Sequence, residues 1–134
     1  MKALICIIGM LTVLLSPSCD KGETNYNSDI KLHKNQPVKV SGTESIFLEA
    51  IEITDSRCPK DVVCVWEGNA MATIRISSDD AIIAVPELCL GSCSANGKSS
   101  ATKFTINGET YELILKDVSV NTNKPFAIVQ VKKT

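Results

Sequence analysis

The composition is that of one ordinary globular domain without a dominant charge. The chain has 134 residues, with 14 Lys and Arg against 15 Asp and Glu and a formal net charge of −1. Because no basic stripe is present, we expect no nucleic-acid partner. Apolar residues make up 44% of the chain, which is enough for a single hydrophobic core.

The first 19 residues have the pattern of an export signal. Lys2 precedes a largely apolar run over residues 3–15, and small residues then lead to Cys19. This run is shorter than the roughly 20 residues that cross a bilayer as a helix, so it predicts a signal that is removed. The segment resembles the lipobox of bacterial lipoproteins, with Ser16 where that family usually has Leu. The resemblance implies removal of residues 1–18, acylation of Cys19 and attachment to a membrane of the bacterial cell envelope. We expect that membrane to be the outer membrane, with the protein on its periplasmic or surface face. The alternative is a plain secretory signal.

Residues 20–36 are mostly polar and turn-prone and lack an apolar period. This composition predicts a flexible tether that holds a domain away from a membrane surface. Pro37 marks the boundary of that domain. We therefore expect a removed leader over 1–18, a lipidated cysteine and tether over 19–36, and a folded domain over 37–134.

Alternation of apolar and polar residues from Val38 onward predicts strands. The clearest alternating segments are 72–77, 111–116 and 127–132. Asn107-Gly108 favours positive φ between two such segments and predicts a hairpin. The apolar residues of 46–53 change phase near Glu49-Ala50, which predicts a bulge that puts Ile46, Leu48, Ile51 and Ile53 on one face. Residues 81–85 are apolar throughout, as expected of a strand covered on both faces.

The pattern as a whole predicts an all-β domain. No segment after the signal has a helical period, and about seven or eight short strands can be counted. We therefore expect a single antiparallel β-sandwich, or a small barrel, that forms a monomeric domain.

Four cysteines remain in the exported part of the chain and predict two disulfides. The pairs Cys58–Cys64 and Cys89–Cys93 are favoured because each lies in a compact, turn-rich segment. Closing a loop this short stabilises by roughly 2 kcal/mol, against about 4 kcal/mol for a cross-pairing such as Cys58 with Cys93, so energy alone leaves the pairing open. The spacings are not those of a zinc knuckle and the only histidine is His33, so we expect no metal and no cofactor.

The most distinctive local sequence covers residues 55–70. It contains Asp-Ser-Arg-Cys-Pro followed by Cys-Val-Trp-Glu-Gly, and it resembles a group of largely uncharacterised small lipoproteins of Gram-negative bacteria. That resemblance implies an exported β domain and brings no known activity. Arg57 is expected to pair with Asp55 or Glu67, or to lie over the ring of Trp66. The first interpretation makes Trp66 a core anchor beside a disulfide staple. The second makes Arg57, Trp66 and Glu67 an exposed patch that binds a partner.

Residues 86–102 are rich in small polar side chains and longer than a usual hairpin loop. We expect either a variable insertion or a contact loop, with Leu90 and Lys98 as candidate contacts. A disulfide in this loop would lower the entropy lost on binding.

The sequence predicts a binding module rather than an enzyme. Ser–His–Asp or Cys–His catalysis would have to recruit His33 from the tether, and no phosphate loop or dinucleotide fingerprint occurs. We therefore expect a lipid-anchored module of the cell envelope that binds an unknown protein or glycan. The alternative is an inhibitor that inserts the 86–102 loop into a secreted or host hydrolase. A third hypothesis is a small envelope hydrolase that uses carboxylates.

Overall fold

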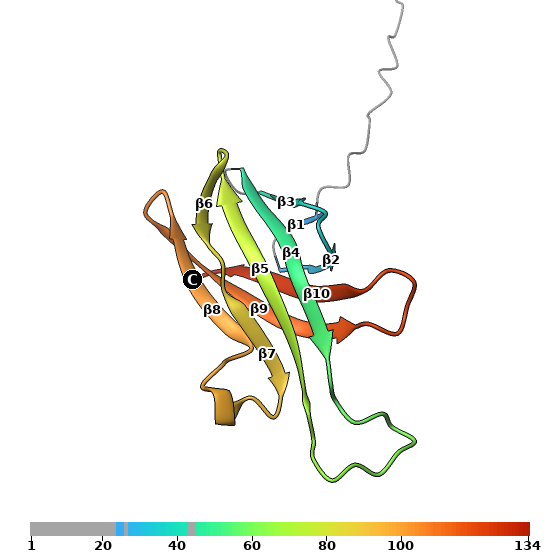
Figure 1. Cartoon of the computed structure of the whole chain (residues 1–134). Helices are drawn as coiled ribbons and strands as arrows, with labels where there is room; N and C mark the ends of the chain where they lie inside the picture. The colour runs from blue at the N-terminus through green and yellow to red at the C-terminus, as the bar shows by residue number, and fades with distance from the viewer. Residues whose placement is uncertain (1–23, 26, 43–44) are drawn as a thin grey trace, which may run out of the picture.

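The structure, a computed structural model, describes residues 24–25, 27–42 and 45–134. Two β-sheets pack against each other around one core (Figure 1). The six-stranded sheet contains β1 (Thr24–Asn25), β3 (Val38–Ser41), β4 (Ile46–Asp55), β5 (Asn69–Ser78), β6 (Ala81–Ala84) and β7 (Glu87–Gly91). The four-stranded sheet contains β2 (Asp29–His33), β10 (Phe126–Lys133), β9 (Glu109–Ser119) and β8 (Ala101–Ile106), in that spatial order. A short 3-10 turn, η1 (Ser94–Asn96), lies between β7 and β8.

The all-β sandwich predicted from the sequence is confirmed, and the two sheets do not close into a barrel. Eight strands, β3 to β10, follow Val38, as the pattern predicted. All strand pairs are antiparallel except β1 with β3. The predicted signal over 1–18 and the acylated Cys19 lie outside the described residues and stay predictions.

The core is filled by the alternate residues that the strand pattern assigned to it. In β5, Ala72, Ile74 and Ile76 are fully buried, while the intervening side chains are partly exposed. The same alternation buries the inward faces of β9 and β10, at Tyr111, Leu113, Leu115, Ala127, Val129 and Val131. Burial of one face per strand is what a two-layer sandwich requires.

The hairpin between β8 and β9 is confirmed. Asn107 has φ 52° and Gly108 has φ 78°, and Ile106 pairs with Glu109 across the turn. Two consecutive residues with positive φ match the twist of the flanking strands, which explains why this dipeptide forms the connection.

A bulge interrupts β4, one residue later than predicted. The register with β5 shifts between Ala50 and Glu52, so Ile51 is the extra residue. Ala50 is fully buried and occupies the core position that the sequence analysis gave to Ile51. Ile53 returns to the core side after the bulge. The bulge therefore preserves the inward face, with a small side chain at its centre.

The prediction that residues 81–85 form a strand covered on both faces is wrong. Ile82 is 62% exposed, Ile83 40% and Val85 48%. β6 ends the path of hydrogen-bonded strands in its sheet and pairs only with β5. A continuous apolar run specifies neither how many neighbours a strand has nor what lies over it.

The tether prediction is wrong for residues 29–33. They form β2, which pairs with β10 over five residues. Ile30 and Leu32 are buried in the core, whereas Asp29 and Lys31 face outward. The strand is short and has only two apolar residues, Ile30 and Leu32, between polar or charged ones. Its alternation of apolar and polar residues was therefore too brief to stand out in a polar segment.

Leu32→Ala tests whether β2 belongs to the core. Because the Leu32 side chain is fully buried, we expect the free energy of unfolding to fall by about 2–5 kcal/mol. Asp29→Ala, at an exposed position of the same strand, should change it by less than about 0.5 kcal/mol. Urea denaturation of both variants measures these changes. An equally small loss of unfolding free energy in Leu32→Ala would show that residues 29–33 do not belong to the core.

Candidate functional site

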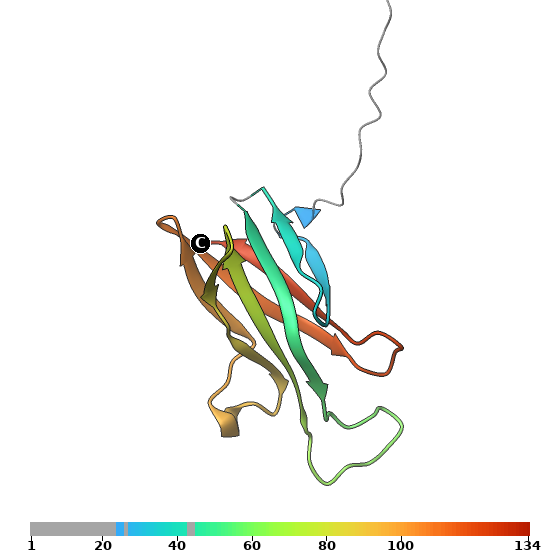
Figure 2. The same cartoon turned by 45° about the horizontal axis from the view of Figure 1, so that its top comes forward.

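The connection between β4 and β5, residues 56–68, protrudes from one end of the sandwich (Figure 2). The Cys58–Cys64 disulfide crosses it, with 5.9 Å between the two Cα atoms. The second disulfide, Cys89–Cys93, joins the middle of β7 to the following loop. Both local pairings favoured from the sequence are therefore confirmed, and the cross-pairing is excluded.

Backbone hydrogen bonds fix the base of this loop. The Ser56 N–H donates to the Asn69 carbonyl at 2.8 Å, and the Cys58 N–H donates to the Glu67 carbonyl at 3.3 Å. Gly68 has φ +68°, and a Cβ atom there would lie 2.0 Å from the Ser56 carbonyl oxygen. Only glycine permits this close approach of two backbones. The two ends of the loop are thus held together independently of the disulfide.

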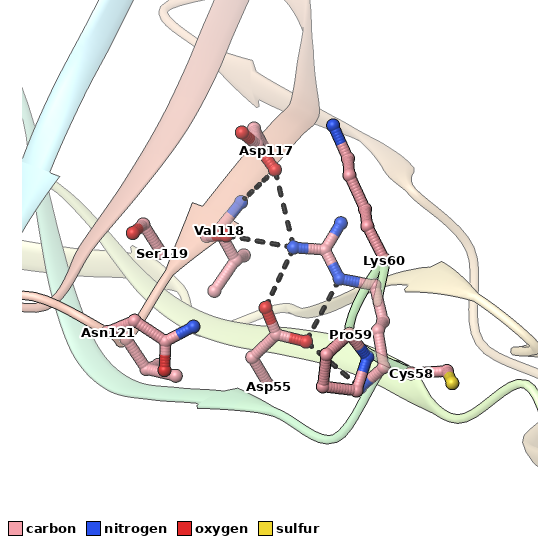
Figure 3. Close-up of a pocket in the computed structure, with 10 residues that line it drawn as sticks. Asp55, Cys58, Pro59, Lys60, Asp117, Val118, Ser119 and Asn121 are labelled. Atoms are coloured by element: carbon pink, nitrogen blue, oxygen red, sulfur yellow. Dashed lines mark hydrogen bonds and ion pairs between the residues drawn. The ribbon is translucent and has the colours of Figure 1, made fainter. Parts of the chain in front are cut away.

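Arg57 links the base of the loop to β9 of the opposite sheet, and Figure 3 draws these hydrogen bonds. Its Nε donates to Asp55 Oδ1 at 2.9 Å and its Nη2 to Asp55 Oδ2 at 2.8 Å. Nη2 also donates to the Val118 carbonyl of β9 at 2.9 Å and lies 3.4 Å from Asp117 Oδ1. Of the three partners that the sequence analysis considered for Arg57, the structure selects Asp55.

This arrangement lowers the pKa of Asp55. The main cause is the hydrogen bonding of its carboxylate to the Arg57 side chain, and burial opposes the shift. The same pair raises the pKa of Arg57. Since a general acid needs a raised pKa near neutral pH, Asp55 is poorly suited to donate a proton. The carboxylate instead acts as an anchor for the guanidinium.

The end of the loop carries an apolar tip, which we define as Val62, Val63, Val65 and Trp66. Val63 is 100% exposed, Val65 96%, Trp66 73% and Val62 57%. The interpretation of Trp66 as a core anchor is therefore wrong. The sequence analysis also missed the three valines, although they lie inside or next to a disulfide loop too short to fold back onto the core.

The remaining candidate contact residues are dispersed. Glu67 is exposed beside the apolar tip, whereas Leu90 is partly buried and packs against the core. Lys98 forms an ion pair with Glu87. Arg57 is engaged by the contacts described above, so of the predicted patch only Trp66 and Glu67 present their side chains outward.

Much of the predicted 86–102 loop is strand. Glu87–Gly91 forms β7, which pairs with β5, and β8 begins at Ala101. Cys89 and Cys93 are buried, so the second disulfide packs inside the fold. Only the residues between these strands remain as a connecting loop, and their exposed side chains are all small or polar.

A pocket of about 660 Å³ adjoins the base of the first loop. It is lined by Asp55, Arg57, Cys58, Pro59, Lys60, Asp117, Val118, Ser119, Val120 and Asn121. These side chains come from two segments, the end of β4 with the start of the loop, and the end of β9 with the residues after it (Figure 3). The pocket and the apolar tip therefore share one structural base.

The described residues contain no cluster of three or more His, Cys, Asp and Glu side chains that would hold a metal ion. Within the same residues, no helix is long and apolar enough to cross a membrane. Comparisons of the chain with protein-family models, with curated proteins and with solved structures found no match. The loop, its apolar tip and the adjoining pocket are therefore the features of this chain that point to a function.

Gly68→Ala tests the rigid base of the loop. Gly97→Ala is the matched control, because Gly97 also has positive φ (64°) but a Cβ atom there would meet nothing within 4 Å. The control should cost about 1–2 kcal/mol for the left-handed conformation alone. Gly68→Ala should cost at least about 2 kcal/mol more, since the Ser56 backbone must move. Thermal unfolding of both variants gives the comparison. Equal losses of stability would mean that the Ser56 backbone moves aside with little loss of free energy.

Asp55→Asn tests the contribution of the Asp55–Arg57 pair to stability. A carboxyl group whose folded pKa is lowered stabilises the fold above its unfolded pKa, and this stabilisation disappears as the pH falls through the folded pKa. We therefore expect the variant to lose about 1.5–3 kcal/mol at pH 7. The difference from the parent should shrink as the pH falls below the ordinary value of 3.8.

Urea denaturation of parent and variant between pH 7 and about pH 2 measures this difference. Asp80→Asn, at an exposed turn, controls for the substitution itself. A loss at Asp55 that is the same at every pH would show that the carboxylate charge is not what stabilises the loop.

Proposed function

We propose that this protein is a binding module of the bacterial cell envelope that binds a partner protein through the apolar tip. The observation that carries the proposal is the exposure of Trp66 and three valines within and directly after the segment closed by the Cys58–Cys64 disulfide. Clustered exposed apolar side chains mark interaction sites, and Trp is enriched among the residues that dominate binding energy.

The rigidity of the loop supports a role in binding. The Cys58–Cys64 disulfide, the hydrogen bonds of Ser56 and the contacts of Arg57 hold the loop before any partner arrives. A loop that is already ordered loses less conformational entropy on association. The apolar tip would therefore bind its partner without a large change in the conformation of the loop.

The charges around the tip favour a protein partner over a lipid surface. Asp61 and Glu67 are exposed on either side of the apolar residues, and with the exposed Lys60 next to Asp61 one cation stands against two carboxylates there. Segments that bind anionic membranes carry a net positive charge beside their apolar residues, because anionic lipids attract Lys and Arg and repel carboxylates. The complementary partner is a protein with an apolar pocket whose rim carries Lys or Arg.

The place of the tip in the fold also supports this choice. β1 pairs with β3 at Val40, which pairs with Ile46 at the start of β4, whereas the loop follows Asp55 at the end of β4. The ten residues of β4 separate these two ends by about 30 Å. An acylated Cys19 would lie at most about 18 Å from Thr24. The tip would then point away from the anchoring membrane, as Figures 1 and 2 illustrate for β1 and the loop.

The test removes the apolar tip without touching the core. The variant is Val63→Ser/Val65→Ser/Trp66→Ser in the full chain. The matched control is Ile82→Ser/Ile83→Ser/Val85→Ser, which removes three exposed apolar side chains from β6 and the residue after it. We expect a partner captured from envelope extract to be held by the parent and by the control, and to be lost by the tip variant.

With the purified partner, the tip variant should bind at least about 100-fold more weakly, because two or more dominant contacts are lost. Trp66 is the only tryptophan of the chain, so its fluorescence in the parent should shift as the partner excludes water. Loss of binding in the control alone would move the contact surface to β6 and contradict the proposal. Tip-dependent binding to phospholipid vesicles, with no protein captured, would show that the tip contacts lipid instead.

A further inference from the structure

The pocket at the base of the loop has the size of a small-ligand site. Its volume is about 660 Å³, within the range of about 300–1,000 Å³ for such sites. One wall comes from the start of the loop, and the other from the end of β9 and the residues after it (Figure 3). The apolar tip is not part of its lining, so the pocket and the tip are separate surfaces.

The internal contacts of the pocket leave a defined set of polar groups available. Both carboxylate oxygens of Asp55 accept hydrogen bonds from Arg57. Arg57 Nη2 is used by Asp55, Val118 and Asp117. Arg57 Nη1 has no hydrogen-bond partner among the described residues, and neither has the ammonium group of Lys60. Together with the Asn121 amide they form a set of donors.

Acceptors lie beside these donors, and the formal charges cancel. Arg57 and Lys60 contribute two positive charges, and Asp55 and Asp117 contribute two negative charges. Asp117 Oδ1 accepts from the Val118 N–H, which leaves Oδ2 without a described partner. The net neutrality disfavours a strongly charged ligand, while the mixture of donors and acceptors suits groups that both donate and accept.

Hydroxyl groups have this dual character, since each supplies one donor and two acceptor lone pairs. The pocket also contains apolar surface from Pro59 and Val120, against which the C–H face of a sugar ring can pack. The guanidinium of Arg57 is already held by four contacts within 3.4 Å, so ordering it on binding costs little. We propose that this pocket binds an uncharged oligosaccharide.

The binding can be tested with the full chain in a detergent that carries no sugar headgroup. The probes are three neutral tetrasaccharides, namely chitotetraose, maltotetraose and cellotetraose. Tetragalacturonate and fully deacetylated chitotetraose serve as acidic and basic probes of similar size. We expect at least one neutral probe, titrated to roughly 10 mM so that a dissociation constant of about 1 mM is visible, to shift the backbone NMR signals of Lys60, Ser119 and Asn121. The charged probes should bind at least about 10-fold more weakly.

Asn121→Ala should weaken binding of the neutral probe at least about 10-fold, because an amide that both donates and accepts is lost. Asn96→Ala, on η1 and outside the pocket lining, is the matched control and should bind like the parent. The inference is overturned if none of the three neutral tetrasaccharides binds, if a charged probe binds more tightly, or if Asn121→Ala leaves binding unchanged. The variant without the apolar tip should keep saccharide binding, so this test succeeds or fails independently of the protein-binding proposal.

Discussion

The contacts of Arg57 are the constraint on which the functional end of this molecule depends. One guanidinium joins the end of β4, through Asp55, to the end of β9, through the Val118 carbonyl. Charge-assisted hydrogen bonds of this kind stabilise by about 1.5–3 kcal/mol each. Because β4 and β9 belong to different sheets, this side chain links the base of the loop to both layers. Together with the backbone hydrogen bonds at the loop base, the Arg57 contacts position both the apolar tip and the pocket.

The features that local sequence determines were predictable. Alternation along β5, β9 and β10 identified their buried faces, and Asn107-Gly108 identified a turn whose φ values few other residues adopt. The two disulfides followed from four cysteines placed in compact segments. In each case the physical cause lies within about ten residues of chain. Such features do not depend on how distant strands are arranged.

The errors concern burial, which distant parts of the chain decide. The apolar run of β6 resembled a central strand, but its place at the end of the sheet path leaves Ile82 exposed. Leu32 lay in a segment too polar to suggest a strand, yet pairing with β10 brings it into the core. Trp66 is a residue that cores often bury, and here it is exposed two residues after Cys64. The available signal was its place between the end of the disulfide at Cys64 and Gly68 at the loop base, a connection too short to give the side chain much freedom to reach the core.

Exposure of the tip is best explained by a use outside the fold. The core of the described chain is complete without these side chains, with fully buried residues contributed by both sheets. Burial of a large apolar side chain stabilises a fold by roughly 1.5–3 kcal/mol. The exposed valines and the tryptophan of the tip do not contribute this free energy to folding. The tip and the pocket also lie at the end of β4 opposite the one next to β1. A module held by its N-terminus would therefore present an apolar finger and a polar pocket together, on the side directed away from its point of attachment. Two chemically different surfaces on one rigid base would let it engage a protein while its pocket holds a sugar chain.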